Sequence, residues 1–180
     1  MLIKNSHLLI DACCLLNLCA SGELLNILQV ISISVQAAIV EEVKQELQKI
    51  ENIEHFEIAI KQNLLLIVDF ESDAEETVFI NYASEIDDGE AATGAIAINR
   101  NWAIATDDKK ATKFLSQESP SLQIVSTLEI IKYWSKIANI ELSKLSNVLN
   151  EIRVKARYCP DKNHRLKSWW EMAIIPNPLR

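Results

Sequence analysis

The amino-acid sequence predicts one α/β domain with three layers, α/β/α, around a central and mostly parallel five-stranded sheet, followed by extra C-terminal helices. Two observations support this prediction. Apolar runs of strand length alternate with stretches of helical periodicity, as in successive βαβ units. The chain has 180 residues, enough for one domain with a buried core, and only three glycines and four prolines, so no linker is apparent in residues 1–150.

The strands are predicted where short runs of Val, Ile, Leu and Phe are long enough for a strand and too short for a helix. In chain order these runs are His7–Ile10, Val30–Val35, Leu64–Phe70, Trp102–Thr106 and Leu122–Ser126. The stretches between and after them repeat apolar residues every three or four positions, which predicts helices. These helices are Cys13–Leu28, Ala37–Ile50, Asp73–Ala83, Gly89–Asn99, Lys109–Ser116, Leu128–Ala138 and Leu142–Arg157.

Composition narrows the class of protein. Hydrophobic residues make up 49% of the chain, yet no unbroken run reaches the roughly 18 residues of a membrane span. The N-terminus lacks the shape of a signal peptide, and we expect a cytoplasmic protein. The four cysteines are Cys13, Cys14, Cys19 and Cys159, and none has the C-x-x-C spacing of a zinc site. We therefore expect them to be small buried apolar residues and not metal ligands or disulfide partners.

Charge is unevenly distributed along the chain. The net charge is −7, which by itself disfavours binding of polyanions. Residues 1–150 hold 11 basic against 22 acidic residues, a balance of −11, whereas residues 151–180 hold 7 against 3, a balance of +4. This basic tail also carries Trp169 and Trp170. It suits contact with a phosphate backbone, or else it is a solvated basic segment whose tryptophans dock on the body or on a partner.

Acidic residues follow two of the predicted strands. Asp11 comes directly after Leu8-Leu9-Ile10, and Asp107 with Asp108 come directly after the strand that begins at Trp102. The carboxyl ends of parallel strands meet at one edge of a sheet, so these carboxylates should converge there. Like charges gathered in this way repel, and a divalent cation would relieve the repulsion. The simpler alternative is that each Asp caps the helix that follows it.

Two further acidic positions lie at predicted helix starts. Glu42 and Glu46 are four residues apart and share one helix face beside an apolar stripe, although surface glutamates are common on such helices. Glu90 follows Asp87 by three positions, as in a capping box. The helix that Glu90 opens is rich in Ala and Gly, so it can approach the sheet closely and hold Glu90 near the strand ends.

Taken together and in order, these residues resemble the PIN-domain family, which includes toxin ribonucleases of bacterial toxin–antitoxin pairs. The resemblance covers about residues 7–127. In it, Asp11 matches the Asp after the first strand, and Glu42, in Ile39-Val40-Glu41-Glu42, is assigned to the Glu of a V-x-x-E helix start. Glu90 matches a G-E-A motif that opens an alanine-rich helix, and Asp108 matches the Asp of a T-x-D pattern. We expect residues 1–127 to form the PIN-like core and residues 128–180 a helical extension packed on the same domain.

The resemblance implies hydrolysis of RNA phosphodiesters by one or two Mg²⁺ or Mn²⁺ ions. Asp11, Glu90 and Asp108 would hold the metal, with Asp107 as a neighbour that shares it, and Glu42 would complete the cluster or orient the attacking water. It also implies a homodimer and an antitoxin that covers the acidic site with a basic segment. Many members carry Thr or Ser and then Asn or Ser after the first Asp. Ala12 and Cys13 stand there in this chain, so we expect a supporting hydrogen-bond donor to be missing.

Competing functions can be compared at Asp11. A phospho-aspartate phosphatase needs a second Asp two positions later, where this chain has Cys13, and a dinucleotide fold needs a glycine-rich first turn, where it has Ala12-Cys13-Cys14.

Lys109 and Lys110 can reach phosphate or remain solvated. The main alternative to a nuclease is a PIN-like module, catalytically weak or inactive, that binds RNA or a protein partner.

Overall fold

The computed structural model describes residues 3–47 and 54–175, and these form a five-stranded, all-parallel sheet with helices on both faces. The strand order is β3-β2-β1-β4-β5. The strands are β1 (His7–Ile10), β2 (Gln36–Val40), β3 (Leu65–Val68), β4 (Ala103–Ala105) and β5 (Ile124–Val125). This is the predicted fold class, and four of the five predicted strands are confirmed, with ends that differ by up to two residues.

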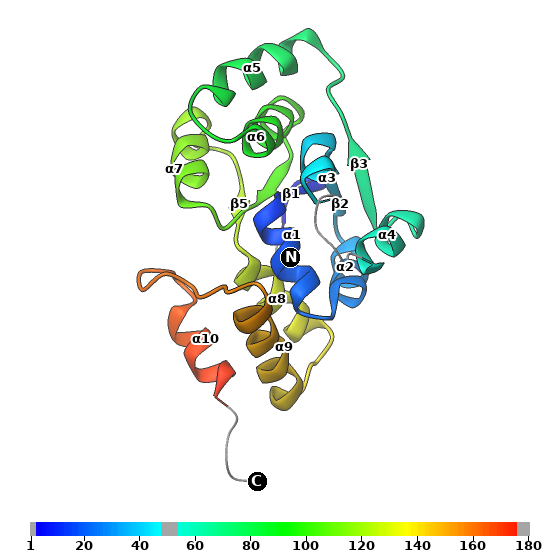
Figure 1. Cartoon of the computed structure of the whole chain (residues 1–180), viewed down its shortest axis with the longest axis vertical. Helices are drawn as coiled ribbons and strands as arrows, with labels where there is room; N and C mark the ends of the chain where they lie inside the picture. Colours follow the sequence, from blue (N-terminus) through cyan, green and yellow to red (C-terminus); the bar gives the residue numbers. More distant parts are fainter. Residues whose placement is uncertain (1–2, 48–53, 176–180) are drawn as a thin grey trace.

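The described part of the chain contains ten helices, and Figure 1 shows how they surround the sheet. Those that precede β4 are α1 (Ala12–Ala20), α2 (Leu24–Ser32), α3 (Glu41–Leu47), α4 (Glu54–Lys61), α5 (Asp73–Ala83) and α6 (Asp88–Arg100). Those that follow are α7 (Lys109–Glu118), α8 (Thr127–Ile137), α9 (Leu142–Lys155) and α10 (Lys167–Ile174). No single described helix is long and apolar enough to span a membrane; α1 and α2 reach that length and composition only as a pair, and a bend of 119° separates them.

The prediction for residues 24–40 was wrong by one element. Val30–Val35 was expected to be a strand, but Leu24–Ser32 is a helix, because Leu24, Ile27, Leu28 and Ile31 repeat at helical spacing and all are buried. The strand lies instead at Gln36–Val40, whose alanines favoured a helix in the sequence. Ala37 and Ala38 are fully buried between β1 and β3, where a small side chain lets neighbouring layers approach.

The remaining helix predictions differ in smaller ways. The helix predicted over Cys13–Leu28 is two helices, because Gly22 has a φ of +71°, a conformation that glycine adopts without a steric penalty. The helix predicted over Ala37–Ile50 begins only at Glu41, and its last three residues lie outside the described ranges. The helices α4 and α10 were not predicted. The other five helices match their predictions to within two residues at each end.

The sheet is covered on both faces because of its connections. The connections from β1 to β2 and from β2 to β3 run in one direction along the sheet, and those to β4 and β5 run in the other. Since crossovers between parallel strands are as a rule right-handed, the two sets of helices lie on opposite faces. The helix α6 contacts β1, β2 and β4, and α5 packs on α6. On the opposite side α2 contacts β2, α8 packs against α1 and α2, and α9 packs against α1. In Figure 1, α5, α6 and α7 lie together at the top of the view and α8, α9 and α10 at the bottom.

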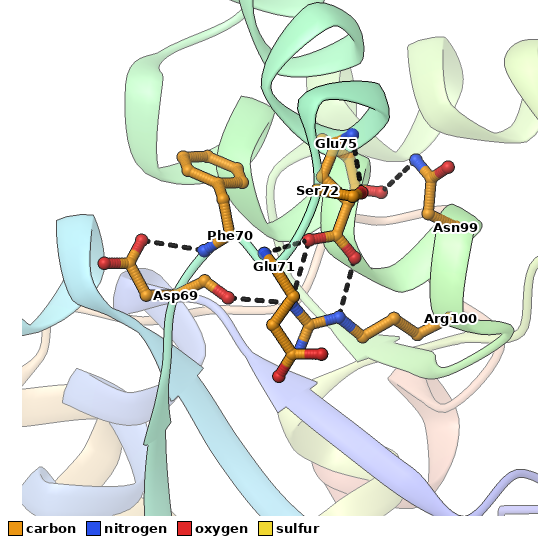
Figure 2. Close-up of polar contacts among 8 residues, drawn as sticks. Asp69, Phe70, Glu71, Ser72, Glu75, Asn99 and Arg100 are labelled. Atoms are coloured by element: carbon orange, nitrogen blue, oxygen red, sulfur yellow. Dashed lines mark hydrogen bonds and ion pairs between the residues drawn. The ribbon is translucent and has the colours of Figure 1, made fainter.

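A polar clamp fixes α6 against the end of β3 and the start of α5 (Figure 2). The Nε of Arg100, the last residue of α6, donates to Oε1 of Glu75 at 2.7 Å, and one of its terminal nitrogens donates to Oε2 of Glu75 at 2.8 Å. The same nitrogen donates to the carbonyl oxygen of Asp69 at 2.7 Å, and the other terminal nitrogen pairs with Glu71 at 3.1 Å. The clamp holds one end of α6, and Glu90 lies at the other end.

Candidate metal centre

The change in direction of the chain between β1 and β4 creates the position where the candidate site lies. Helices leave these two adjacent strands toward opposite faces, which opens a crevice at the carboxyl ends of the strands. Asp11 directly follows β1, and its backbone N–H donates to the carbonyl of Ala105, the last residue of β4, at 3.0 Å. Asp108 is the third residue after β4. The sheet therefore places these two carboxylates at one edge, as predicted.

Three of the predicted site residues, Asp11, Glu90 and Asp108, are close enough to interact electrostatically. Burial raises the pKa of Glu90 to about 7, and the negative charges of Asp108 and Asp11 add to this rise. Burial also raises the pKa of Asp11, with a further contribution from Asp108. Glu90 comes from the start of α6, so the three carboxylates converge from β1, α6 and the end of β4. Glu90 and Asp11 are each less stable in the charged form than a solvated carboxylate would be.

The alternative that these acidic residues only cap helices applies to Asp108 but not to Asp11 or Asp87. Asp11 precedes α1 but makes no side-chain capping hydrogen bond. Asp87 likewise makes no cap on α6, although Glu90 accepts a hydrogen bond from the backbone N–H of Asp87, which is half of a capping box. Asp108 does cap α7, since its Oδ1 accepts from the N–H of Ala111 at 2.8 Å. Capping therefore accounts for Asp108 in part and for Asp11 not at all.

Asp11 is held by two side-chain donors. The thiol of Cys13 donates to its Oδ2 at 3.0 Å, and the hydroxyl of Thr106 donates to the same oxygen at 3.1 Å. The expectation that Ala12 and Cys13 leave the site without a supporting donor is thus corrected. A thiol is a weak donor, but it occupies the place of a hydroxyl or amide, and Thr106 adds a second donor from the end of β4.

Asp107 faces a different set of partners from Asp108. Its Oδ2 accepts from the amide of Asn17 at 2.9 Å and from the hydroxyl of Thr127. Its Oδ1 accepts from the N–H of Thr127 at 3.2 Å and from the hydroxyl of Tyr158 at 3.3 Å. These donors come from α1, α8 and the segment after α9. In this structure the carboxylate of Asp107 joins those elements behind the site, and its predicted share in the metal remains a prediction.

Glu42 lies in a different electrostatic environment from the other three. Burial raises its pKa, and the charges that add to this rise are those of Asp69, Glu41 and Asp88. Its Oε2 is buried without a hydrogen-bond partner in the described structure. The V-x-x-E pattern assigned to Glu42 fits Val43-Lys44-Gln45-Glu46 letter for letter, one turn later in α3. Glu46 is therefore a second candidate for the fourth acidic position.

The donor set suits a hard cation bound partly through water. Among the described residues, no three acidic, imidazole or thiol side chains form a preassembled metal-binding group. Mg²⁺ does not require such a cage, because it keeps several waters and usually takes only one or two protein carboxylates. Burial is the main cause of the raised pKa values of Glu90 and Asp11, and repulsion between the carboxylates adds to it. A bound cation would relieve that repulsion. Asp11, Glu90 and Asp108 are the residues that fit this role.

The site opens into a cavity of about 1710 Å³. Glu90, Asp107 and Asp108 line it together with α7, β5 and residues 155–165 from the C-terminal part of the chain. The sequence predicted the acidic residues but missed this wall. It also missed Asn17, Thr106, Thr127 and Tyr158 as supporting residues, because Thr127 and Tyr158 lie 20 and 51 positions after Asp107 and no local pattern links them.

The sequence model of the PIN-domain family matches residues 7–167, which is most of the chain and extends past residue 127. This chain belongs to the PIN-domain family, whose fold is of the nuclease type. None of the curated proteins compared with it matches.

Proposed function

We propose that this protein is a metal-dependent ribonuclease that hydrolyses RNA phosphodiester bonds. The observation that carries the proposal is the mutual effect of Asp11, Glu90 and Asp108 at the edge of the sheet. Membership of the PIN-domain family supports it independently. The three carboxylates would hold Mg²⁺ or Mn²⁺, which when bound lowers the pKa of a coordinated water and neutralises charge on the leaving oxygen.

The protein's own residues prepare the site for this chemistry. Thr106 and Cys13 fix the Oδ2 of Asp11 and so orient its carboxylate. The cap on α7 fixes the Oδ1 of Asp108 and leaves its Oδ2. Glu90 accepts from the backbone N–H of Asp87, so its carboxylate is held against the start of α6. Ligands oriented in this way lose little freedom when they bind.

Cleavage of a mixed RNA pool tests the proposal. Purified protein is incubated with Mg²⁺ or Mn²⁺ and, separately, with EDTA, and Asp11→Asn, Glu90→Gln and Asp108→Asn are compared with wild type. We expect cleavage that requires metal and is abolished in all three variants. Glu85→Gln is the matched control, because Glu85 is an exposed carboxylate close to α6 and outside the site. Glu42→Gln and Glu46→Gln decide which glutamate of α3 contributes.

A second readout is independent of catalysis. Mg²⁺ that binds the folded state raises the unfolding temperature of the wild type, and this rise should be lost in Asp11→Asn and Asp108→Asn. If the folded wild type leaves all RNA intact but retains RNA, the protein is a PIN-like binding module. If Mg²⁺ stabilises neither wild type nor variants, the metal centre itself is wrong.

We also propose a homodimer and a basic inhibitor protein as partners, by analogy with toxins of the family. The acidic site and the balance of −11 over residues 1–150 suit a basic inhibitor segment. Size-exclusion chromatography with light scattering tests the dimer. Co-purification from the host tests the inhibitor, and recovery of the protein without any basic partner would contradict it.

A further inference from the structure

The segment of residues 156–166, here named the C-terminal arm, links α9 to α10 and forms one wall of the cavity that contains Glu90 and Asp108. Four polar contacts fasten the arm to residues beside the metal centre. They are Tyr158 to Asp107 at 3.3 Å, Asp161 to Lys109 at 2.5 Å, His164 to Ser126 at 3.1 Å, and Arg165 to Glu129. Because these contacts are spread along the arm, it has a defined position in the wall of the cavity.

Arg157, near the start of the arm, has an unusual backbone conformation. Its φ is +53°, in the left-handed region that most side chains avoid. The other residues with positive φ in the described structure are Gly22, Asn63, Asn101 and Asn139, all of the types that tolerate this region best. At Arg157 the conformation follows the end of α9 and directs the chain into the arm. An asparagine or glycine would meet the backbone requirement better, so the side chain itself needs another explanation.

The charge pairing in the cavity supplies that explanation. Of the lysines and arginines that line it, Lys109, Lys155 and Arg165 each pair with a carboxylate. Among the described residues, Arg157 and Lys113 line the cavity and form no ion pair or hydrogen bond there, and both are exposed. The cavity thus contains two free cations from different elements, α7 and the arm, together with the acidic centre.

We propose that Arg157, with Lys113, binds backbone phosphates of the RNA strand that enters the acidic centre; this inference rests on the proposed nuclease function. A guanidinium binds phosphate through two parallel hydrogen bonds, which fixes the strand as well as attracting it. The cavity exceeds the roughly 300–1,000 Å³ of small-molecule pockets, so it suits a polymer. A chain of net charge −7 needs local cations where a polyanion approaches carboxylates.

The test is the salt dependence of RNA binding in two matched variants. Fluorescein-labelled single-stranded RNA is titrated with full-length protein in EDTA, where no metal-dependent cleavage occurs, at several salt concentrations. Arg157→Gln and Arg153→Gln remove the same charge, and Arg153 is exposed on α9 but does not line the cavity. We expect Arg157→Gln to weaken RNA binding about tenfold. The slope of the logarithm of the binding constant against log salt, which is negative, should become less steep by about 0.7. Arg153→Gln should leave both close to wild type.

The possible outcomes separate this inference from the proposed nuclease function. Equal effects of the two variants, or a wild type that does not bind RNA, would overturn the role of Arg157. Arg157→Asn suits the positive φ, so loss of binding in a variant at least as stable as wild type excludes misfolding as the cause. If wild type cleaves RNA and Arg157→Gln cleaves with unchanged KM, the nuclease stands and this inference fails. If Arg157-dependent binding occurs without any cleavage, the inference stands and the proposed nuclease fails.

Discussion

The environment of the Glu90 side chain disfavours its ionised form. Burial and the charges of Asp108 and Asp11 raise its pKa from the ordinary 4.5 to about 7. A group of this kind lowers the stability of the metal-free fold whenever it is ionised. Such a cost is typical of residues retained for function, since a neutral side chain at the same position would serve the fold better.

We therefore predict that Glu90→Gln stabilises the metal-free protein. Gln keeps an oxygen that can accept from the N–H of Asp87 but carries no charge, so the free energy of unfolding should rise by about 1 kcal/mol at pH 8, after allowance for partial solvent screening. Urea denaturation in EDTA measures it, with Glu85→Gln as the control that should change little. A variant less stable than wild type would mean that Glu90 is a structural residue.

Among single residues, the sequence predicted the acidic site residues better than the residues that form hydrogen bonds with them. Asp11 directly follows β1 and Asp108 is the third residue after β4, so their positions in the chain alone bring them to one edge of the sheet. The partners of Asp107 come from three elements, which no local pattern reveals. The cysteines also differ among themselves, because Cys14 is buried as predicted whereas Cys159 is exposed.

Between elements, the clamp in Figure 2 joins β3, α5 and α6 through one arginine with two unequal carboxylate partners. The side chain of Glu75 is 4% exposed and that of Glu71 is 77% exposed, while Arg100 is 11% exposed. An ion pair contributes most where water is excluded, and its loss there leaves an uncompensated buried charge. The two glutamates should therefore differ widely in their effect on stability.

We predict that Glu75→Gln lowers the free energy of unfolding by about 2–3 kcal/mol, whereas Glu71→Gln lowers it by less than about 0.5 kcal/mol. The pH dependence follows from the pKa of Glu75, which the hydrogen bonds from Arg100 lower below its ordinary 4.5. This stabilisation is complete above pH 4.5 and is lost as pH falls through the lowered pKa. Denaturation from pH 7 to pH 3 should show a shallower loss for Glu75→Gln than for wild type, and parallel curves would contradict the assignment.

The error in residues 24–40 has a physical cause at the level of elements. Val30-Ile31-Ser32-Ile33 is rich in β-branched residues, which favours a strand locally, yet burial follows the helical spacing that begins at Leu24. Ala37 and Ala38 favour a helix in isolation but lie in a strand buried on both faces. In both segments tertiary packing, and not local propensity, determines the secondary structure. The small residues of α6 were expected to let this helix approach the sheet, and α6 does contact β1, β2 and β4. Gly94 in addition makes room for a neighbour that was not predicted, since a Cβ there would overlap the side chain of Leu115 in α7.

Over the whole molecule, the C-terminal helices contribute to the same core as the sheet. Trp134 of α8 is 1% exposed, Leu149 of α9 is fully buried, and both belong to the hydrophobic cluster that contains β1. Trp170 of α10 is also buried, so it docks on the body, as one of the two readings of the basic tail expected. The sequence could not decide between those readings, because burial of the tail depends on distant partners.

We predict that Trp134→Ala destabilises the whole chain by about 3–5 kcal/mol in one cooperative transition. Trp169, which is only half-buried, serves as the matched control, and Trp169→Ala should cost clearly less. Far-ultraviolet circular dichroism and tryptophan fluorescence should report the same urea midpoint in each variant. Two separate transitions would mean that residues 1–127 and 128–180 fold as independent units.

The position of the C-terminal arm also has a consequence for biosynthesis. A chain emerges from the ribosome N-terminus first, at about 5–20 residues per second, so the 49 residues from Lys109 to Arg157 take roughly 2–10 s to add. During that interval the carboxylates have been made, but the wall that carries Arg157 and the tyrosine that supports Asp107 have not. If the proposed role of Arg157 holds, a nascent chain would lack part of its RNA-binding surface while it is still attached to the RNA-rich machinery that makes it.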